Sequence, residues 1–559
     1  MNIIKIKKIL SDYLASKVEG FTSDEIMLMF EYPPEPKMGD LAFPCFRLSK
    51  VLRKSPVQIA QMLAADFSCA YCEHAEAVNG YLNIYLDKNV YTYEILNEIL
   101  KVKNNYGSSD IGNGKTVLLD YSCPNIAKPF HIGTFGSTII GHSLKLLHEK
   151  IGYKCVGINY LGDWGTQFGK LITAYKLWGD KQKIEENGID ELVKIYVKFH
   201  AEAEKDKSLE DTARAEFVKL EKGNEENLKI WKWFIDISFG EYETTYKLLG
   251  ITFDVITGES ASYSITQPVV DELKEKGLLI VDDGASIVRL DDYNMPPCMI
   301  LKSDGSTIYA VRDIATVLDR KRKYNFDKCV YVTGNEQILY FNQWRKVLEL
   351  MGYDWQCVHI SYGMVSINGA RLSTRTGNVI YVKDLISMAI EKVKEIIEEK
   401  NPNLQNKDET AEAVGVGAIV FHYLMNNRIK DINFIIEDAL SFDGSTGPYA
   451  QYTYARTCSL LEKGNTDQPL NPAYQPNEEE KNVAYVLSLY PEKILEASNS
   501  YEPSVITRYI IDICTAFNRF YHEHQIIGAD IFRLKLTKAV KIVLGDALGL
   551  ICMKKPEKI

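Results

Sequence analysis

Hydrophobic positions along this chain follow two spacings, and the change from one to the other divides the sequence into segments. Residues 4–17 and 55–66 repeat apolar positions every three or four residues, as amphipathic helices do, whereas VNGYLNIYL at 78–86 predicts a strand. The polar stretch NNYGSSDIGNGK at 104–115 predicts a linker. We therefore expect a separate small α/β domain over residues 1–110.

The next apolar segments predict a parallel sheet. Residues 116–122 read as a buried strand, 137–150 as a helix that ends at Gly152, and 153–160 as a second strand. A strand, a helix and a strand of these lengths form a βαβ unit, whose strands lie parallel. Sheet-forming sequence resumes with TIYAV at 307–311 and KCVYVTG at 328–334.

Charged helices interrupt the sheet-forming sequence between about 175 and 300, which predicts a solvated helical insertion. Further on, VSINGARLS predicts a hairpin that turns at Asn368-Gly369. From about 411 onward the pattern is nearly all helical, with a loop at 463–478. We expect a sheet-containing domain over 115–440 and a helical domain over 441–559.

Composition narrows the class of protein. A chain of 559 residues is too long for one hydrophobic core, and 46% hydrophobic residues is ordinary for a globular protein. The net charge of −10 argues against a protein wrapped in nucleic acid, although it allows a local basic face. No segment is apolar for long enough to span a bilayer, and the N-terminal segment lacks the apolar run of a signal peptide. We expect a cytoplasmic protein with no membrane partner.

Eleven scattered cysteines indicate free thiols in a reducing compartment. Cys69 and Cys72, with His74 nearby, have the spacing of metal ligands, but no second Cys-x-x-Cys exists to complete a zinc site. Two loop cysteines are the better interpretation. We expect no tightly bound metal or organic cofactor.

Residues 117–141 carry the clearest chemistry. A buried strand opens through a short loop, with Lys128, His131 and Gly133, onto a helix. Free N–H groups and the positive end of the dipole at a helix N-terminus favour a phosphate, and a lysine and a histidine add donors for the same anion. The pattern predicts a nucleotide site. The alternative for His131 alone is a buried histidine that caps the next helix.

Several motifs, in order along nearly the whole chain, resemble those of arginyl-tRNA synthetases. They are MGDLAFPCF from 38, NGYLNIYL from 79, PNIAKPFHIGT at 124–134, YLGDWGTQFGKL at 160–171, ARLSTRTGNV at 370–379, GPYAQYTYARTCSLL at 447–461 and the C-terminal LGLICMKKPEKI. The resemblance implies a class I fold: a Rossmann-type parallel-sheet catalytic domain with a helical insertion, a small α/β N-terminal domain that contacts tRNA, and an all-helical C-terminal anticodon-binding domain.

The same resemblance implies a two-step reaction. ATP with Mg²⁺ activates L-arginine to arginyl-adenylate, and the terminal ribose of tRNA(Arg) then takes the arginyl group. Lys128 and His131 would act on the phosphates, with Gly133 and Thr134 against ATP. The chain departs from the family here, because Thr134 replaces the usual second histidine and Gly136 the common arginine.

The second signature departs as well, because it contains no lysine. Arg371 and Arg375 are its available cations for pyrophosphate, and Ser373 and Thr374 its hydroxyl donors to ATP. Arginine binds phosphate bidentately, so the charge is kept although the geometry differs. An ordinary Ser/Thr-rich turn is a fair alternative for Ser373 and Thr374.

A guanidinium ligand calls for a carboxylate and an aromatic or hydroxyl partner. Tyr309 and Asp313 are four residues apart and therefore share a face if the segment is helical. The resemblance implies that both contact the guanidinium, with three further arginine-binding residues, Asp120, Asn125 and Gln337. Without the family, Asp313 could equally pair with Arg312 or Arg320. Asp163 and Trp164 are expected to shape the floor of the pocket.

The C-terminal helices interleave aromatic and basic residues. Tyr452 and Arg456 are our candidates for tRNA contact, since unpaired bases stack on aromatic and arginine side chains. Phe517 and Phe520 are expected to be packing residues. We expect a monomer.

Two alternatives to an arginine–tRNA ligase stay open at this point: a class I relative that uses another amino acid, and a catalytically weakened tRNA-binding paralogue.

Overall fold

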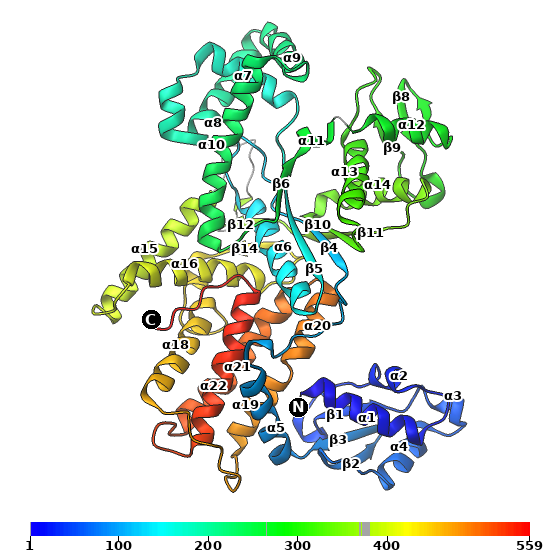
Figure 1. The fold of residues 1–559 in the computed structure, drawn as a ribbon, viewed down its shortest axis with the longest axis vertical. Coiled ribbons are helices and arrows are strands. Elements are labelled where there is room, and N and C mark those ends of the chain that lie inside the picture. Colours follow the sequence, from blue (N-terminus) through cyan, green and yellow to red (C-terminus); the bar gives the residue numbers. More distant parts are fainter. Residues whose placement is uncertain (1, 264, 368–369, 372–380) are drawn as a thin grey trace.

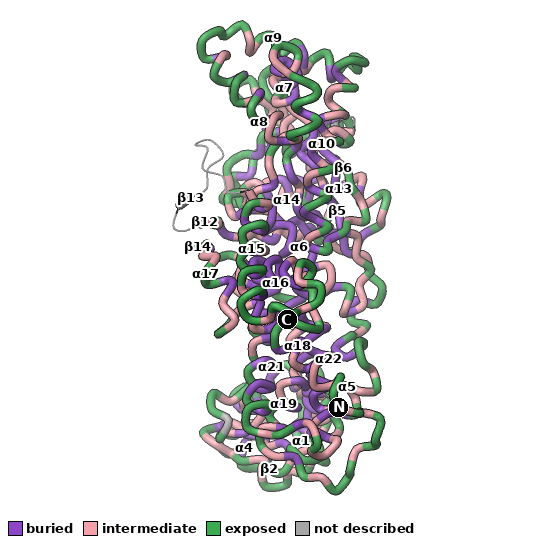
Figure 2. The backbone as a smooth tube through the Cα atoms, turned by 90° about the vertical axis from the view of Figure 1, so that its left-hand side faces the viewer, coloured by how far each residue is buried: buried purple, intermediate pink, exposed green. Residues whose placement is uncertain are grey.

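The computed structural model describes residues 2–559 except 264, 368–369 and 372–380. The molecule is elongated, with the N-terminal strands at one end and the helices α7–α9 at the other (Figure 1). Figure 2 shows buried backbone running along the middle of the molecule, while much of α9 is exposed.

A five-stranded parallel sheet forms the centre of the molecule. Its strands lie in the order β11-β10-β4-β5-β6, so the order reverses between β4 and β10. This is half of a doubly wound sheet, in which ligands bind beyond the carboxyl ends of the strands on either side of the reversal. The strands are β4 (Thr116–Asp120), β5 (Lys154–Leu161), β6 (Val255–Gly258), β10 (Lys328–Gly334) and β11 (Gln356–Tyr362).

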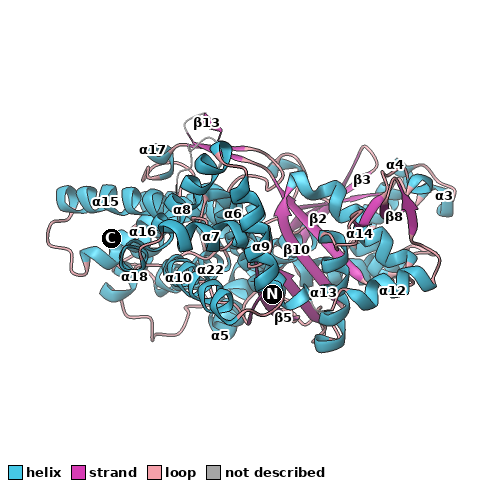
Figure 3. Cartoon of the chain, turned by 90° about the horizontal axis from the view of Figure 1, so that it is seen from above, coloured by secondary structure: helices cyan, strands magenta, loops and turns pink. Residues whose placement is uncertain are grey.

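Alternating residues of β4 serve the two faces of the sheet. Val117 and Leu119 belong to the core that also contains α6 (Ile132–Lys150), and Leu118 belongs to the core of α13 (Tyr309–Tyr324) and α14 (Ile338–Leu350). Figure 3 shows the sheet strands between these helices. Because both faces are covered, β4 reads as a continuous apolar run rather than an alternating one.

Two predicted elements begin elsewhere than expected. The helix expected from residue 137 begins at Ile132, because His131 caps its first turn. The segment 307–311, expected to be sheet-forming, instead leads into α13, which begins at Tyr309. The apolar positions 310, 311, 314, 315 and 317 have helical spacing, which the five residues 307–311 are too few to show.

The expected helical insertion is purely helical only in its first part, and its later part combines helices with strands. Its helices are α7 (Thr166–Trp178), α8 (Lys181–Lys205), α9 (Ser208–Glu221) and α10 (Glu225–Leu249). Strands follow, contrary to the prediction: β6 joins the central sheet, and a small antiparallel sheet comes next, with α11 (Glu259–Tyr263), α12 (Gln267–Glu275), β7 (Ile280–Asp282), β8 (Ala285–Val288) and β9 (Cys298–Leu301). Strands of three or four residues carry too little pattern to be recognised locally.

A second small sheet begins directly after β11, the last strand of the central one. In it β12 pairs antiparallel with β13 and parallel with β14, and Ile367 lies opposite Ala370. The predicted turn residues Asn368 and Gly369 lie outside the described residues. The elements of this region are β12 (Val365–Ile367), β13 (Ala370–Arg371), α15 (Val382–Lys400), α16 (Lys407–Leu424), β14 (Ile432–Phe434) and α17 (Ile436–Ala439).

The N-terminal segment forms an antiparallel sheet in the order β1-β3-β2. Its elements are α1 (Ile3–Lys17), α2 (Ser23–Met27), β1 (Leu41–Pro44), α3 (Ser49–Leu52), α4 (Pro56–Ala65), β2 (Cys72–Val78), β3 (Tyr81–Leu86) and α5 (Lys88–Val102). It packs against the C-terminal helices: Lys7 pairs with Glu492 at 2.7 Å, and Tyr93 donates to the backbone oxygen of Tyr474 at 2.7 Å.

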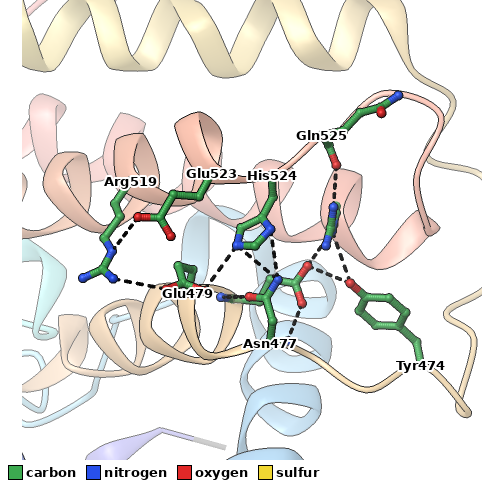
Figure 4. A network of polar contacts seen from close by, with 9 residues as sticks. Tyr474, Asn477, Glu479, Arg519, Glu523, His524 and Gln525 are labelled. Carbon is green, nitrogen blue, oxygen red and sulfur yellow. Dashed lines mark hydrogen bonds and ion pairs between the residues drawn. The ribbon is translucent and has the colours of Figure 1, made fainter.

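The C-terminal region is helical, with α18 (Gly447–Lys463), α19 (Glu478–Ser488), α20 (Tyr490–Ser500), α21 (Ser504–Glu523) and α22 (Ile531–Leu550). A polar network joins the start of α19 to the end of α21 (Figure 4). The Arg519 guanidinium bonds to Glu479 at 3.3 Å and Glu523 at 3.2 Å, and His524 lies 3.2 Å from Glu479. The two carboxylates thus already share a cation.

No helix in the described part of the chain combines the length and the apolar character needed to cross a membrane.

Candidate active site

Two adjoining cavities open beyond the carboxyl ends of β4 and β10, where the strand order reverses. The first, here called the acidic cavity, has a volume of about 450 Å³, and its lining includes Asp120, Tyr309, Asp313 and Glu259. The second, the histidine cavity, has a volume of about 550 Å³ and is lined by His131, Gly133 and Thr134 among others. Both are lined by Cys123, Asn125, Thr333 and Gln337. Two ligands placed in them would meet at these shared residues.

Asp313 lines the acidic cavity and forms no ion pair with the described residues. The Tyr340 hydroxyl donates a hydrogen bond to its carboxylate. Burial raises the pKa of Asp313 to about 6, and the hydrogen bond from Tyr340 partly offsets this rise. Neither alternative pairing occurs, because Arg312 pairs with Glu259 and Arg320 with Asp120. A cationic ligand would supply the charge that Asp313 lacks.

Asp120 ends β4 and lines the same cavity, but it is already neutralised. Its Oδ2 accepts from Arg320 Nη2 at 2.5 Å, and both side chains are buried. The Cys123 thiol donates to the other carboxylate oxygen at 2.9 Å. The sequence assigned Asp120 a direct role as a second acid, whereas the structure shows it bound within the protein.

Glu259 is an acid of the cavity that the sequence did not single out. It follows β6 directly, lies 3.4 Å from Arg312, and burial raises its pKa to about 7. Asp163 holds the adjacent backbone by accepting from the Ser260 amide at 2.8 Å and its hydroxyl at 2.6 Å. Asp163 and Trp164 do not themselves line either cavity, and Asp163 acts on the acidic cavity only through the backbone next to Glu259.

The other predicted arginine-binding residues lie around the same cavity. Tyr309, the first residue of α13, is 65% exposed, with its ring 5.6 Å from the Arg312 guanidinium carbon. Asn125 and Gln337 lie at the junction of the two cavities. Nothing in the local sequence pattern marks Glu259, whose place depends on β6 pairing with β5.

His131 both caps α6 and lines the histidine cavity. Its Nδ1 accepts from the amides of Gly133 at 3.1 Å and Thr134 at 3.3 Å. Burial and the nearby Lys128 lower the pKa of the imidazole, so His131 is neutral at pH 7 and carries its proton on Nε2. The capping alternative is therefore correct, and it fixes the tautomer whose Nε2–H lies beside the Thr134 hydroxyl. It also means that these two amides are not free for phosphate.

The loop that carries Lys128 is held in an unusual backbone conformation. Ser122, Cys123 and Ala127 have φ values of 78°, 50° and 58°, in the left-handed region that non-glycine residues seldom adopt. Tyr242 of the insertion fixes the loop, because its hydroxyl bonds to the Asn125 oxygen at 2.7 Å and the Lys128 oxygen at 2.6 Å.

The Lys128 side chain is exposed and does not line either cavity. The surrounding protein lowers the pKa of its ammonium. Within the described ranges we find no ion pair to Lys128, so its charge is available to a ligand.

The departures from the family's first signature have structural counterparts. Thr134 is buried, and its hydroxyl lies 3.4 Å from Nε2 of His131. A Cβ on Gly136 would overlap the Tyr423 hydroxyl, which occupies the space beside α6. An arginine at 136 therefore does not fit unless Tyr423 moves. A Cβ on Gly133 would lie 3.0 Å from the His131 ring, so this glycine makes room for the imidazole.

The predicted second-signature residues Arg375, Ser373 and Thr374 lie outside the described residues. Arg371 is described only by its backbone, which pairs with Ser366.

The two tRNA candidates lie together at a third cavity, of about 560 Å³. The Arg456 guanidinium carbon lies between two rings, 5.0 Å from the centre of Tyr452 and 4.4 Å from that of Tyr521. The sequence missed Tyr521, which is 36% exposed at the end of the aromatic run. Phe517 and Phe520 are fully buried, as predicted.

Family models match three consecutive parts of the chain. The catalytic domain of class I tRNA synthetases (R) matches residues 95–436, the DALR anticodon-binding domain residues 450–559, and the arginyl-tRNA synthetase N-terminal domain residues 5–86. The first model alone covers more than half of the 559 residues.

Relatives and solved structures agree with this assignment. The chain is 48% identical to the arginine–tRNA ligase of Alkaliphilus metalliredigens and 45% identical to that of Clostridioides difficile, with 99% of each chain covered. Its fold is similar to Thermus thermophilus arginyl-tRNA synthetase, with a TM-score of 0.82 at 24% identity, covering 95% of this chain and 96% of that one. The Plasmodium falciparum enzyme gives a TM-score of 0.81 at 23% identity, covering 99% and 98%. The predicted fold class is confirmed, and the chain belongs to the arginyl-tRNA synthetase family.

Proposed function

We propose that this chain ligates L-arginine to tRNA(Arg) in two steps. ATP, as its Mg²⁺ complex, first converts arginine to arginyl-adenylate with release of pyrophosphate. The terminal ribose of the tRNA then attacks the adenylate and receives the arginyl group. ATP, Mg²⁺, arginine and tRNA are all substrates in this proposal, so the chain needs no resident cofactor.

The observation that carries the proposal is the pair of cavities that meet at Asn125 and Gln337. The acidic cavity holds Asp313, an acid without a cationic partner among the described residues, which suits a guanidinium. In our proposal the guanidinium lies against Asp313 and Tyr309, and Asn125 and Gln337 hold the α-amino and carboxylate end. The carboxylate would then point toward the histidine cavity, where ATP presents its α-phosphate.

Glu259 joins this arginine site in the proposal, because its carboxylate faces the same cavity. Asp120 has an indirect role. Its pairing with Arg320 closes one wall and keeps the Arg320 charge from repelling the ligand.

On the phosphate side, the roles follow from the available donors. Nε2 of His131 donates to a phosphate oxygen, and the Thr134 hydroxyl beside it adds a second neutral donor. Lys128 supplies the charge, since His131 is neutral. Gly133 lies in the cavity wall against ATP. Arg371 and Arg375, with Ser373 and Thr374, are proposed to reach the pyrophosphate as the leaving group forms.

The tRNA is proposed to contact both ends of the molecule. Residues 1–110 are assigned to the N-terminal tRNA-contacting domain, 115–440 to the catalytic domain and 441–559 to the anticodon-binding domain. Tyr452 and Arg456, now with Tyr521, are proposed to stack on unpaired bases. We also propose a monomer that works in the cytoplasm, a compartment that suits a chain whose eleven cysteines are unpaired.

ATP–pyrophosphate exchange tests the proposal, measured with each amino acid in the presence and absence of tRNA. Citrulline is the matched control for arginine, because it has nearly the same shape but a neutral urea group. We expect exchange with arginine and at least 100-fold less with citrulline, since a site built for a charged donor rejects the neutral analogue (roughly 3 kcal/mol).

Exchange with another amino acid at a higher rate would reject arginine as the substrate. Binding of tRNA without exchange under any condition would instead indicate a weakened paralogue. Exchange that accepts citrulline as readily as arginine would show that the acidic cavity is not the guanidinium site.

A further inference from the structure

Cys69 and Cys72 form a turn at the edge of the N-terminal sheet, away from the cavities described above. The Cys72 amide donates to the Cys69 oxygen at 3.1 Å, which closes a four-residue turn just before β2. The Cα atoms at the ends of such a turn lie within about 7 Å, close to the separation that a disulfide needs. The turn thus brings the two side chains within bonding reach without movement of the sheet.

Both thiols are partly exposed, so small molecules can reach them. They also influence each other: a hydrogen bond from Cys72 lowers the pKa of the Cys69 thiol to about 6, while the pKa of the Cys72 thiol is raised. At neutral pH the pair therefore holds a thiolate beside a thiol, which is the arrangement that makes a cysteine pair reactive.

A second pair of cysteines shows what proximity alone provides. Cys329 and Cys357 are direct neighbours on the parallel strands β10 and β11. Both are buried, and burial raises the pKa of each thiol, that of Cys357 to about 12. The two thiols of this pair are close together, but they are not accessible to solvent and are not ionised at neutral pH. The pair therefore serves as an internal control.

A zinc site does not explain the first pair. Among the described residues, the only grouping of three metal-ligating side chains is Glu479, Glu523 and His524, on the C-terminal helices. The two sulfurs alone leave a tetrahedral zinc ion without its other ligands.

We propose that Cys69 and Cys72 are a reversible dithiol–disulfide site that exchanges with low-molecular-weight disulfides. Neither cysteine lines the cavities proposed for arginine and ATP.

The exchange proceeds in two balanced steps. The Cys69 thiolate attacks one sulfur of the external disulfide, whose S–S bond breaks and releases one small thiolate. Cys72 then loses its proton to that thiolate or to solvent and attacks the Cys69 sulfur. The mixed disulfide breaks, the Cys69–Cys72 bond forms and the second small thiol leaves. The protein loses two hydrogens, and one molecule of external disulfide is reduced to two thiols.

Incubation of the reduced full-length protein with oxidised glutathione at pH 7 tests the proposal. Remaining thiols are blocked with N-ethylmaleimide, and peptides are mapped by mass. We expect the peptide that contains Cys69 and Cys72 to lose the mass of two hydrogens and to carry no N-ethylmaleimide. Dithiothreitol should reverse this change. Cys329 and Cys357 should be recovered as blocked thiols after unfolding. Cys155 is also partly exposed, but the pKa of its thiol is raised to about 12. It should therefore react at least about tenfold more slowly than Cys69.

Single variants separate the two steps. In Cys72→Ser, Cys69 should keep a glutathione adduct that wild type resolves. In Cys69→Ser, modification should fall to the rate of Cys155. Thermal unfolding of each variant controls for loss of fold. Three outcomes overturn the proposal. The first is that wild type retains glutathione on Cys69, and the second is that Cys329 and Cys357 are oxidised as fast as Cys69 and Cys72. The third is that the protein holds one zinc ion per chain and releases it only when both thiols are blocked.

Discussion

Asp313 gives the sharpest quantitative prediction, because its charge state governs how a guanidinium can bind. Burial moves the pKa of the free site from its ordinary value of 3.8 to about 6. This shift corresponds to an unfavourable free energy of about 3 kcal/mol for the ionised carboxylate in the folded protein. A bound guanidinium would relieve that cost, and so the proposed ligand and the observed shift are linked.

The sign of the pH dependence follows from this shift. The guanidinium stays protonated throughout, and only the ionised carboxylate pairs with it. Arginine affinity should therefore rise as pH increases through about 6 and fall below it. From pH 7.5 to pH 5 the ionised fraction of Asp313 drops from nearly one to about one tenth, which alone weakens affinity about tenfold. The stability of the ligand-free protein has the opposite pH dependence. Because the carboxyl pKa is 3.8 unfolded and about 6 folded, the free energy of unfolding should fall as pH rises from about 4 to about 6, with the full cost present above pH 6.

The perturbation is Asp313→Asn, which keeps the shape of the side chain and removes the charge. Loss of a charged hydrogen bond should weaken arginine binding at pH 7.5 by about 1.5–3 kcal/mol, or about 10- to 150-fold. The variant should also show a shallower pH dependence. Glu259 also titrates, with a pKa of about 7 that the Asp313 charge helps to raise, so the difference between the two profiles reports the Asp313 charge together with its effect on Glu259.

Isothermal titration calorimetry of arginine between pH 5 and pH 8, without ATP or tRNA, measures both effects. Asp319→Asn is the matched control: it lies on the same helix but pairs with Arg322 and Lys323 outside the acidic cavity. The control should bind arginine like wild type. The reasoning is refuted if Asp313→Asn binds arginine with unchanged affinity, or if its pH profile runs parallel to that of wild type.

Three further predictions concern other parts of the molecule. Lys128→Ala should reduce arginine-dependent ATP–pyrophosphate exchange by about 100- to 1000-fold while the unfolding midpoint stays unchanged, because it removes charge at the phosphates; a rate near wild type would remove Lys128 from the mechanism. Gly136→Ala should lower the free energy of unfolding by about 1–3 kcal/mol, measured in urea, through its overlap with a buried tyrosine. Gly240→Ala, a helical position with nothing nearby, should instead leave stability unchanged or raise it by up to about 1 kcal/mol, and equal effects at both sites would contradict the packing argument. Tyr521→Ala should weaken tRNA binding by about 1–3 kcal/mol in filter binding, whereas Tyr293→Ala, on a distant exposed turn, should not; equal losses would exclude stacking at the C-terminal cavity.

The sequence by itself determined the features that local pattern and short motifs encode. The strand at 328–334 has the bounds that its apolar run predicted, and the strand–loop–helix unit from β4 to α6 follows from a buried run, a polar loop and a helical period. The candidate residues of the loop lie within a few positions of one another, so the local sequence is enough to indicate Lys128, His131 and Gly133. The role of His131 as the helix cap was predicted only as an alternative.

Only the tertiary structure decided which charges meet. Asp120 and Arg320 are 200 residues apart, and their pairing places a cation of the protein against an acid that the sequence had assigned to the ligand. Glu259 entered the cavity because a four-residue strand pairs with β5 at the edge of the sheet. The space beside Gly136 belongs to Tyr423 on a helix from much later in the chain. The physical reason is the same in each case. Ion pairing, pKa shifts and close packing depend on distances between remote residues, whereas spacing along the chain reports only on neighbours.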